Sequence, residues 1–333
     1  MKAILLIISL LLSLSCFGQK ERKKIVLIRS FEINLVRSHI KHFFNSLKEQ
    51  GINPSNVDII QFNGRGNPKL IKEFVENYII QHSPDVVVTN ATLATAIARP
   101  YLREKNIPQV YFTVFDPVDA GIVADLENSK RENIAGAYLL YEGDVRGELF
   151  HEIIGKKDDR VGMIYSSYPS EISSFKSWKS FFDRHGKYSF SASMINYPGN
   201  NQLELKKLLS DFKRQVEKMK DEVDYFILPD GPLGVNPIYV RWIEKISGKP
   251  VLFATSEQSV KAGAIYYVHP DVKLHGEIAA KIVVDILKGR DIRLMPSQIP
   301  RPPVIFLNLK SAKKFGIDVP KKYLNRAKGY TLY

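Results

Sequence analysis

Short runs of β-branched and other apolar residues alternate with amphipathic stretches along almost the whole chain. The first run, residues 24–29, is apolar between charged ends and predicts a buried strand. Residues 33–50 follow with apolar side chains at helical spacing, and Gly51 is well suited to end that helix. Four such pairs occupy about 95 residues. Because the apolar runs are continuous, they predict parallel strands covered by helices on both faces, and hence an α/β fold.

The pattern loosens after Asp116-Pro117 and then starts again, and a length of 333 residues also favours two domains. We therefore predict two Rossmann-like (flavodoxin-like) lobes with parallel sheets, joined by a hinge. The first lobe is expected to comprise residues 22–118 and about 253–295, and the second lobe 119–252 and about 300–325. Expected strands lie at 24–29, 57–62, 85–89, 109–114, 134–139, 161–165, 190–195, 225–228, 251–254, 264–268 and 304–307.

The composition is that of a globular protein, with 44% hydrophobic and 25% charged residues, which excludes a mainly disordered or fibrous chain. A single cysteine permits neither an internal disulfide nor a cysteine-based zinc site. The formal net charge of +13 comes from Lys and Arg along the whole chain, a pattern that we interpret as a solvated surface and not as a nucleic-acid site. Attraction to an anionic membrane or to an acidic partner is the alternative.

The first 18 residues have the features of an export signal: a basic start, about a dozen apolar residues and small residues at the end. Cleavage after Gly18 would release the chain, whereas cleavage before Cys16 would leave a lipidated cysteine that anchors it to a membrane. Both alternatives place the protein outside the cytoplasm, either in the periplasm or held by lipid on the outer side of a bacterial membrane.

Polar and aromatic side chains follow several of the predicted strands. Because ligands of doubly wound folds bind beyond the carboxyl ends of the strands, these residues are the candidates for lining a site between the lobes. A helix start after residue 91 would suit a carboxylate, and a plain helix cap or turn is the alternative at each position. The candidate ligand-binding residues are Thr89, Asn90, Thr92, Phe115, Asp116, Ser166, Ser167, Asp230 and Ser256.

Signals for catalysis and for cofactors are weak. No Gly-x-Ser-x-Gly or His-Glu-x-x-His pattern occurs, and Gly64-Arg65-Gly66 matches only the start of a dinucleotide fingerprint. His39 and His42 lie three residues apart on one predicted helix, but helix faces commonly carry histidines without a metal. We therefore expect no enzyme activity, no cofactor and no metal.

Several motifs, in order and at matching spacing, resemble one known family. They are Pro84 to Thr89 (PDVVVT), Ile107 to Val114 (IPQVYFTV), Asp116 to Val123 (DPVDAGIV), Asn133 to Gly136 (NIAG) and Asn308 to Ile317 (NLKSAKKFGI). They are similar to motifs of the ABC-transporter substrate-binding proteins of the type I periplasmic-binding-protein fold, a family that includes tryptophan- and phenylalanine-binding members.

The chain departs from that family where its ligands bind. Asn90 to Leu93 stand where the family often has Gly-Thr-Pro-Ala, Ser166-Ser167 replace Asn-Pro, and Asp230-Gly231 replace Asp-Asn. The resemblance therefore implies the fold, but it does not carry over the ligand.

What the resemblance implies about function is a binding protein that closes on a small ligand and delivers it to the membrane permease of an ABC transporter. An amino acid or similar zwitterion would place its carboxylate at the helix start after residue 91 and its ammonium group at Asp230. No nucleic acid is expected as a partner, and a membrane only through the lipid anchor. A ligand-sensing receptor that acts on a signalling partner is the alternative, followed by an exported enzyme.

Overall fold

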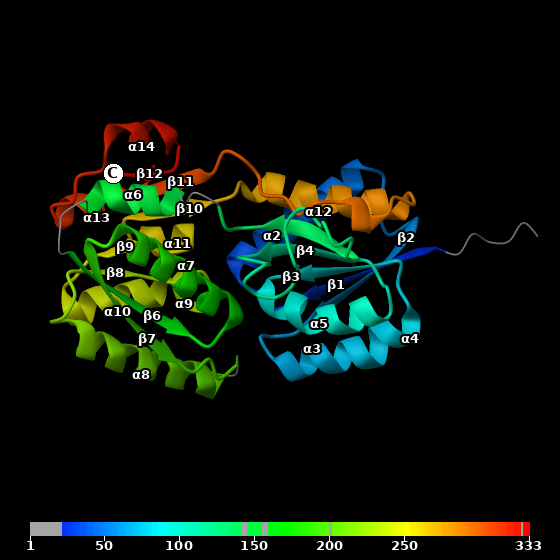
Figure 1. Ribbon diagram of the computed structural model, residues 1–333, viewed down its shortest axis with the longest axis horizontal. Coiled ribbons are helices and arrows are strands. Elements are labelled where there is room, and N and C mark those ends of the chain that lie inside the picture. Colours follow the sequence, from blue (N-terminus) through cyan, green and yellow to red (C-terminus); the bar gives the residue numbers. More distant parts are fainter. Residues whose placement is uncertain (1–21, 142–144, 155–158, 200–201, 328) are drawn as a thin grey trace, which may run out of the picture.

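The computed structural model describes residues 22–141, 145–154, 159–199, 202–327 and 329–333. The expected export signal and Cys16 lie outside these residues. Two lobes stand side by side, each built on its own sheet, as Figure 1 shows. The predicted two-lobed α/β class is therefore confirmed. No helix among the described residues has the length and apolar character needed to cross a bilayer.

The first lobe contains a five-stranded parallel sheet in the order β2-β1-β3-β4-β5. Its strands are β1 (Lys23–Arg29), β2 (Val57–Asn63), β3 (Val86–Asn90), β4 (Gln109–Val114) and β5 (Ile134–Tyr138). One face is covered by α2 (Asn34–Glu49) and α12 (Val272–Leu287), which pack against each other. The other face is covered by α3 (Pro68–Phe74), η1 (Val75–Ile79) and α5 (Thr92–Glu104), with the short α4 (Ile80–His82) beyond η1.

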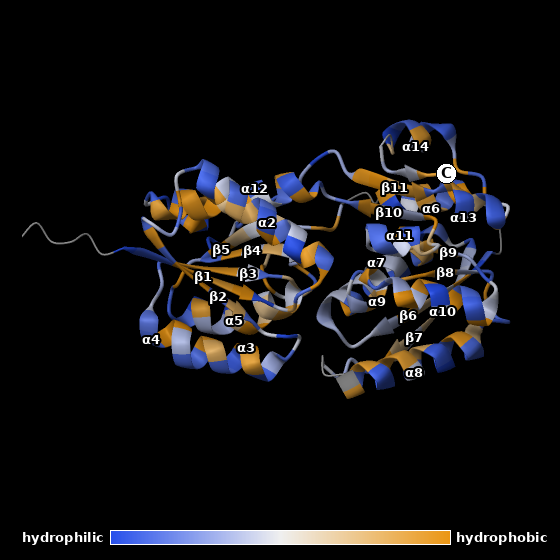
Figure 2. Cartoon of the chain, turned by 180° about the vertical axis from the view of Figure 1, so that it is seen from behind, coloured by the Kyte–Doolittle hydropathy of each residue, from blue (hydrophilic) through white to orange (hydrophobic). Residues whose placement is uncertain are grey.

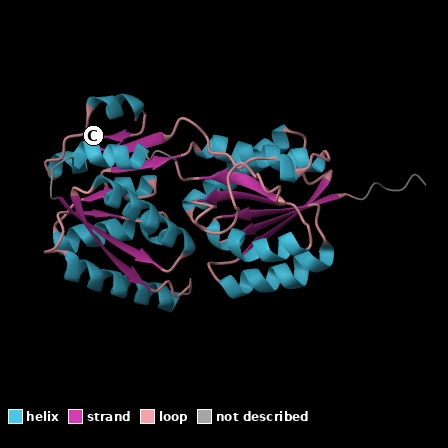
Figure 3. Ribbon diagram, viewed as in Figure 1, coloured by secondary structure: helices cyan, strands magenta, loops and turns pink. Residues whose placement is uncertain are grey.

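The second lobe contains a seven-stranded sheet in the order β12-β11-β10-β9-β8-β6-β7, parallel except where β11 runs antiparallel to β10. Its strands are β6 (Asp159–Ser166), β7 (Tyr188–Ile195), β8 (Tyr225–Ile227), β9 (Val251–Phe253), β10 (Tyr266–His269), β11 (Val304–Asn308) and β12 (Thr331–Leu332). Its helices are α6 (Val145–Ile154), α7 (Pro169–His185), α8 (Gln202–Met219), α9 (Pro232–Val235), α10 (Pro237–Ser247), α11 (Glu257–Lys261), α13 (Leu309–Lys314) and α14 (Lys321–Arg326). Figure 3 shows helices around both sheets.

Local chemistry explains where the helices begin and end. The Asn67 side chain accepts hydrogen bonds from the N–H groups of Lys69 and Leu70, so it caps α3, which opens with Pro68. Asp271 caps α12 in the same way. Gly51 follows the end of α2 with φ +84°, a conformation that glycine adopts without strain. Apolar residues fill the strands, and helices alternate polar and apolar residues along their length (Figure 2).

The sheets divide the chain differently from the expected lobe boundaries. Residues 119–138, expected in the second lobe, end in β5, which pairs with β4 in the first sheet. Residues 253–269, expected in the first lobe, run to the end of β10, which pairs with β9 and β11 in the second sheet. The apolar runs predict the strands and their order along the chain. Which sheet a strand joins depends on its hydrogen bonds to neighbouring strands, and the periodicity of its side chains does not encode those neighbours.

The chain passes between the lobes three times. The crossings lie between β5 and α6, between β10 and α12, and between η2 (Ile292–Leu294) and β11. In the third crossing, Gln298 lies beside β5, and its backbone forms hydrogen bonds with Gly136 and Tyr138. Further along, the Tyr141 hydroxyl donates to the carbonyl of Pro300 over 2.7 Å, so two crossings are joined to each other. These adjacent segments form the hinge region.

Candidate ligand-binding site

A cavity lies between the lobes, at the carboxyl ends of the strands of both sheets. The volume of the cavity that is accessible to water is about 60 Å³. This is room for roughly four or five water molecules. Its apolar walls come from both lobes, with Phe31 and Phe115 on the first and Tyr168 and Tyr267 on the second. A wider groove of about 440 Å³ shares Phe31 and Val235 with the cavity. The cavity is thus small, mainly apolar and open on one side, where it continues into the larger groove.

On the first lobe, the start of α5 borders the cavity through Ala91 and Thr92. Ala91 has φ +67° and ψ 160°, an unusual backbone conformation for a residue with a side chain, and it provides no side-chain cap for the helix. Thr113, which also lines the cavity, has φ +62°. The Ser30 hydroxyl accepts from the N–H of Ala94 at 2.9 Å. Ser30 thus satisfies one N–H group in the first turn of α5, and the partial positive charge of the helix start favours an anion at the cavity.

On the second lobe, Asp230 borders the cavity and forms an ion pair with Arg146. The guanidinium lies 2.7 Å from a carboxylate oxygen of Asp230, and the two side chains are only 6% and 14% exposed. The same oxygen accepts from the Ser174 hydroxyl at 3.0 Å, and Arg146 also donates to Ser177 at 2.6 Å. The Asp230 carboxylate is therefore fixed in position beside the cavity.

Aromatic rings surround the guanidinium of Arg146. Its central carbon lies 5.2 Å from the ring centre of Phe115, 4.8 Å from that of Trp178 and 5.7 Å from that of Phe253. Phe115 belongs to the first lobe and the other two rings to the second, so Arg146 contacts both lobes. Such cation–π contacts stabilise a guanidinium that has little access to water.

A second carboxyl group, Glu171, lies beneath the site with no exposed surface. It accepts from the backbone N–H groups of Ser166 and Leu233, each at 2.6 Å, and so joins the end of β6 to the loop that carries Asp230. A Cβ on Gly231 would lie 2.3 Å from Cγ of Glu171, which explains the glycine there. Burial, reinforced by the nearby Asp230, raises the pKa of Glu171 to about 7, against the two backbone donors that act to lower it.

Two further contacts hold the lobes together over the cavity. Asp119, in the loop between β4 and β5, accepts from the Ser173 hydroxyl at 2.6 Å and from the Lys176 ammonium at 2.9 Å, both on α7 of the second lobe. The rings of Phe31 and Tyr168 meet edge to face with centres 5.9 Å apart. The conformation is therefore one in which the lobes touch at the rim of the site.

Three of the predicted site residues line the cavity between the lobes, namely Thr92, Phe115 and Asp230. Ser256 lines the wider groove, and its hydroxyl also accepts from the N–H of Ser259 to cap α11. Asn90 lies one layer behind the cavity wall, where its amide donates to the hydroxyl of Thr113.

The other predicted residues have structural partners and are not among the residues that line the cavity. The buried Thr89 hydroxyl accepts from Thr95 and Gln109, and Asp116 accepts from two backbone N–H groups in a turn. Ser166 accepts from the N–H of Tyr168, and Ser167 from the N–H of Tyr197. The alternative interpretation as a turn describes Asp116 and Ser166, whereas Thr89 and Ser167 bond to residues distant in the chain or on another element.

Arg146, Glu171, Tyr267 and Phe31 were not among the predicted residues. Arg146 and Glu171 are charged residues in the first turns of helices, where such side chains are usually exposed, so the sequence carries no signal that they are buried at the site. Phe31 lies directly after a predicted strand, so the rule used for the other candidates could have found it.

Comparisons with known proteins agree with this geometry. The model of the family described as "ABC transporter substrate binding protein" matches residues 34–330. A tyrosine-binding protein of Clostridioides difficile is 22% identical over 304 residues, which cover 91% of this chain and 83% of that protein.

Among solved structures, the ABC domain from Streptococcus pneumoniae in complex with L-Trp has a TM-score of 0.77 at 19% identity, over 94% of this chain and all of that one. A conserved domain protein from Vibrio cholerae has a TM-score of 0.75 at 20% identity with the same coverage. At these identities the structures show a shared fold.

Two lobes that enclose a cavity at the carboxyl ends of both sheets, joined by three crossings, define a bilobed ligand-binding protein. The family match covers most of the chain, and this protein belongs to the ABC-transporter substrate-binding proteins. The resemblance found in the sequence motifs is thereby confirmed.

Proposed function

We propose that this protein is exported, binds a small zwitterion of the amino-acid class between its lobes, and presents it to the permease of an ABC transporter. One observation carries the ligand class: the start of α5 on the first lobe and a fixed carboxylate on the second border the same small cavity. The start of α5 suits the ligand carboxylate, and Asp230 suits the ammonium group.

The remaining walls favour an apolar or aromatic ligand side chain. Phe31, Phe115, Tyr168 and Tyr267 present rings to the cavity, and Val268 adds an aliphatic surface. The tyrosine-binding relative and the structure with L-Trp support this choice. Closure of the lobes around the ligand would remove both of its charged groups from water.

The family supports delivery to a permease, because its members are substrate-binding proteins of ABC transporters. The apolar segment at residues 3–14 and the same family membership support export. The +13 net charge is compatible with a protein that works at an anionic membrane surface.

The ligand class is tested by titrating the chain from Gln19 onward with tyrosine, tryptophan, phenylalanine and leucine, followed by calorimetry and thermal unfolding. A ligand at 100 times its dissociation constant is expected to stabilise the protein by about 2.7 kcal/mol. Decarboxylated and N-acetylated analogues are expected to bind at least tenfold more weakly, since each lacks one of the two charges.

Asp230→Asn tests the assigned ammonium partner, with Asp183→Asn as its control. Asp183 lies on the same lobe but is 62% exposed and pairs only with the neighbouring-turn Lys179 in the contacts described. Binding is expected to weaken at least tenfold in the first variant and to stay unchanged in the second. Equal affinities in both variants would remove Asp230 from the site, and failure of every zwitterion to bind would overturn the ligand class.

A further inference from the structure

The excess positive charge is concentrated at the carboxyl-terminal end of the chain. Residues 296–333 contain eight Lys and Arg residues but only one acidic residue, Asp318, so they carry 7 of the 13 excess charges. This differs from the even distribution inferred from the sequence. The residues form β11, α13, α14 and β12, which make one edge of the second lobe (Figure 1).

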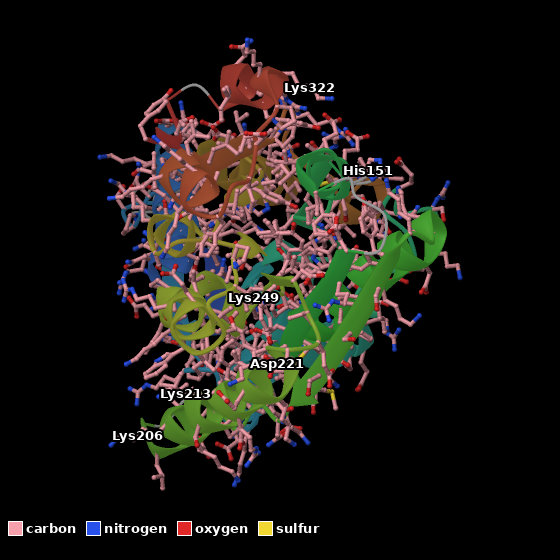
Figure 4. All side chains as sticks on the ribbon, turned by 90° about the vertical axis from the view of Figure 1, so that its left-hand side faces the viewer. His151, Lys206, Lys213, Asp221, Lys249 and Lys322 are labelled. Carbon is pink, nitrogen blue, oxygen red and sulfur yellow. The ribbon has the colours of Figure 1, made fainter. Side chains whose placement is uncertain are left out.

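The cations of this region point to solvent. We define the basic edge as the seven exposed residues Arg301, Lys310, Lys313, Lys314, Lys321, Lys322 and Arg326. Two of them form ion pairs with the body of the lobe, Lys314 with Glu244 and Lys322 with Glu152. Figure 4 looks onto this end of the molecule, with Lys322 at its top and Lys249, Lys213 and Lys206 below it. Further lysines thus lie on the outer end of the lobe below the basic edge, with Asp221 among them.

Helix stability does not explain several of these cations. Lys310 lies in the first turn of α13, and Lys321 and Lys322 are the first two residues of α14. A helix start carries partial positive charge, so cations there are unfavourable and acidic residues are preferred. Neither helix has an acidic residue in its first turn. Lys322 is compensated by its ion pair with Glu152, but no ion pair with Lys310 or Lys321 is described, and their placement is unfavourable for the helices, which suggests an outside partner.

Exposed aromatic residues accompany the cations. Tyr330 is 43% and Tyr333 90% exposed, and both belong to the segment that ends in β12 beside β11. Tyrosine rings favour the boundary between water and lipid, where the ring enters the headgroup region and the hydroxyl stays hydrated. Five of the seven residues of the basic edge are lysines, whose ammonium groups sit on flexible stems. Such groups suit a surface with diffuse negative charge, whereas the planar guanidinium of an arginine suits a single carboxylate.

We propose that the basic edge is a docking surface for anionic lipid headgroups. It lies on the second lobe, whereas the chain enters the fold at β1 on the first lobe, at the end of that strand away from the cavity. Contact through the basic edge would hold the second lobe at the membrane and leave the ligand cavity accessible between the lobes.

The proposal is tested by flotation of the chain from Gln19 onward with two kinds of vesicle. One is pure phosphatidylcholine, and in the other about one lipid in three is the anionic phosphatidylglycerol. The apolar residues 1–18 are omitted because they would bind lipid by themselves. Binding is expected only to the anionic vesicles, with a loss of at least tenfold on moving from about 0.05 M to about 0.5 M salt.

The triple variant Lys310→Glu, Lys313→Glu, Lys321→Glu is expected to lose at least tenfold in vesicle binding. Its control, Lys41→Glu, Lys48→Glu, Lys130→Glu, makes the same change in net charge at exposed lysines of the first lobe and is expected to bind like wild type. Equal loss in both variants would reduce the effect to net charge and overturn the proposal. Absence of binding to anionic vesicles would also overturn it, and capture of an acidic permease segment by the same edge would then identify a protein partner instead. Ligand titration of both variants keeps this test separate from the proposed ligand function.

Discussion

Arg146 and Asp230 form an ion pair of 2.7 Å in which neither side chain has much access to water. The pair joins the start of α6 to the loop after β8, and Phe115 of the opposite lobe lies over its cationic end. Because a buried charge is costly without its partner, this pair determines the position of the carboxylate that we assign to ligand recognition.

Replacement of Arg146 by methionine is expected to destabilise the protein by about 3 kcal/mol, because Asp230 would stay buried without its cation. Urea unfolding measures the loss. Combining the change with Asp230→Asn is expected to recover part of it, since the uncompensated charge is then absent. A double variant that is less stable than Arg146→Met alone would contradict this account of the pair.

The fold and part of the site could be predicted from the sequence, because strands that are buried on both faces have a recognisable composition and their loops follow directly. Phe115, Thr92 and Asp230 were found in this way, and they line the cavity. Arg146 and Glu171 could not be found, since their burial depends on the packing of α6 on β10 and of α7 on β6 and β7. The same applies to β5 and β10, whose sheet neighbours come from distant parts of the chain.

Asp119 is expected to keep the lobes together through Ser173 and Lys176. Asp119→Ala should change the free energy of unfolding by less than about 1 kcal/mol, since the contact is at the rim. It should nevertheless increase the radius of gyration of the ligand-free protein in small-angle scattering, because the hinge is then less restrained. Asp125→Ala is the matched control: Asp125 lies in the same loop but accepts from Ser129 within the first lobe. Identical scattering of the two variants would dismiss the interlobe role.

The buried Glu171 should give stability a distinct pH dependence. Its pKa in the folded protein is about 7, against 4.5 in the unfolded chain, so between these values the folded state holds a proton that the unfolded state has released. Raising the pH through this window therefore lowers the free energy of unfolding, by about 3 kcal/mol in total.

Glu171→Gln removes that titration. The stability of wild type relative to this variant is expected to be greatest near pH 5 and to decline toward pH 8, which chemical unfolding at several pH values would reveal. Glu257→Gln serves as a control, because Glu257 also lies in the first turn of a helix of this lobe but is 44% exposed. Its stability curve should run parallel to that of wild type. A parallel curve for Glu171→Gln as well would show that Glu171 does not titrate in this range.

Three buried histidines lie where the second crossing leaves the second lobe. Their effect on the pH dependence of the free energy of unfolding should be opposite to that of Glu171. His39 of α2 lies 5.2 Å from His269 at the end of β10 and 4.9 Å from His275 of α12, measured between ring centres. Burial lowers the pKa of His39 to about 4 and lowers the pKa values of His269 and His275 as well. His42 disfavours the cationic form of His39, and Asp271 only partly offsets the burial.

Because the unfolded chain binds protons at these histidines from about pH 6.5 downward while the folded protein does not, acidification from pH 6.5 toward pH 4 is expected to destabilise the fold. His39 contributes about 3 kcal/mol over that interval, and the lowered pKa values of His269 and His275 act in the same direction. The melting temperature of His39→Gln should therefore fall less steeply with acid than that of wild type, whereas replacement of the exposed His82 by glutamine should leave the slope unchanged. Equal slopes for wild type and His39→Gln would mean that burial does not lower the pKa of His39 below its value in the unfolded chain.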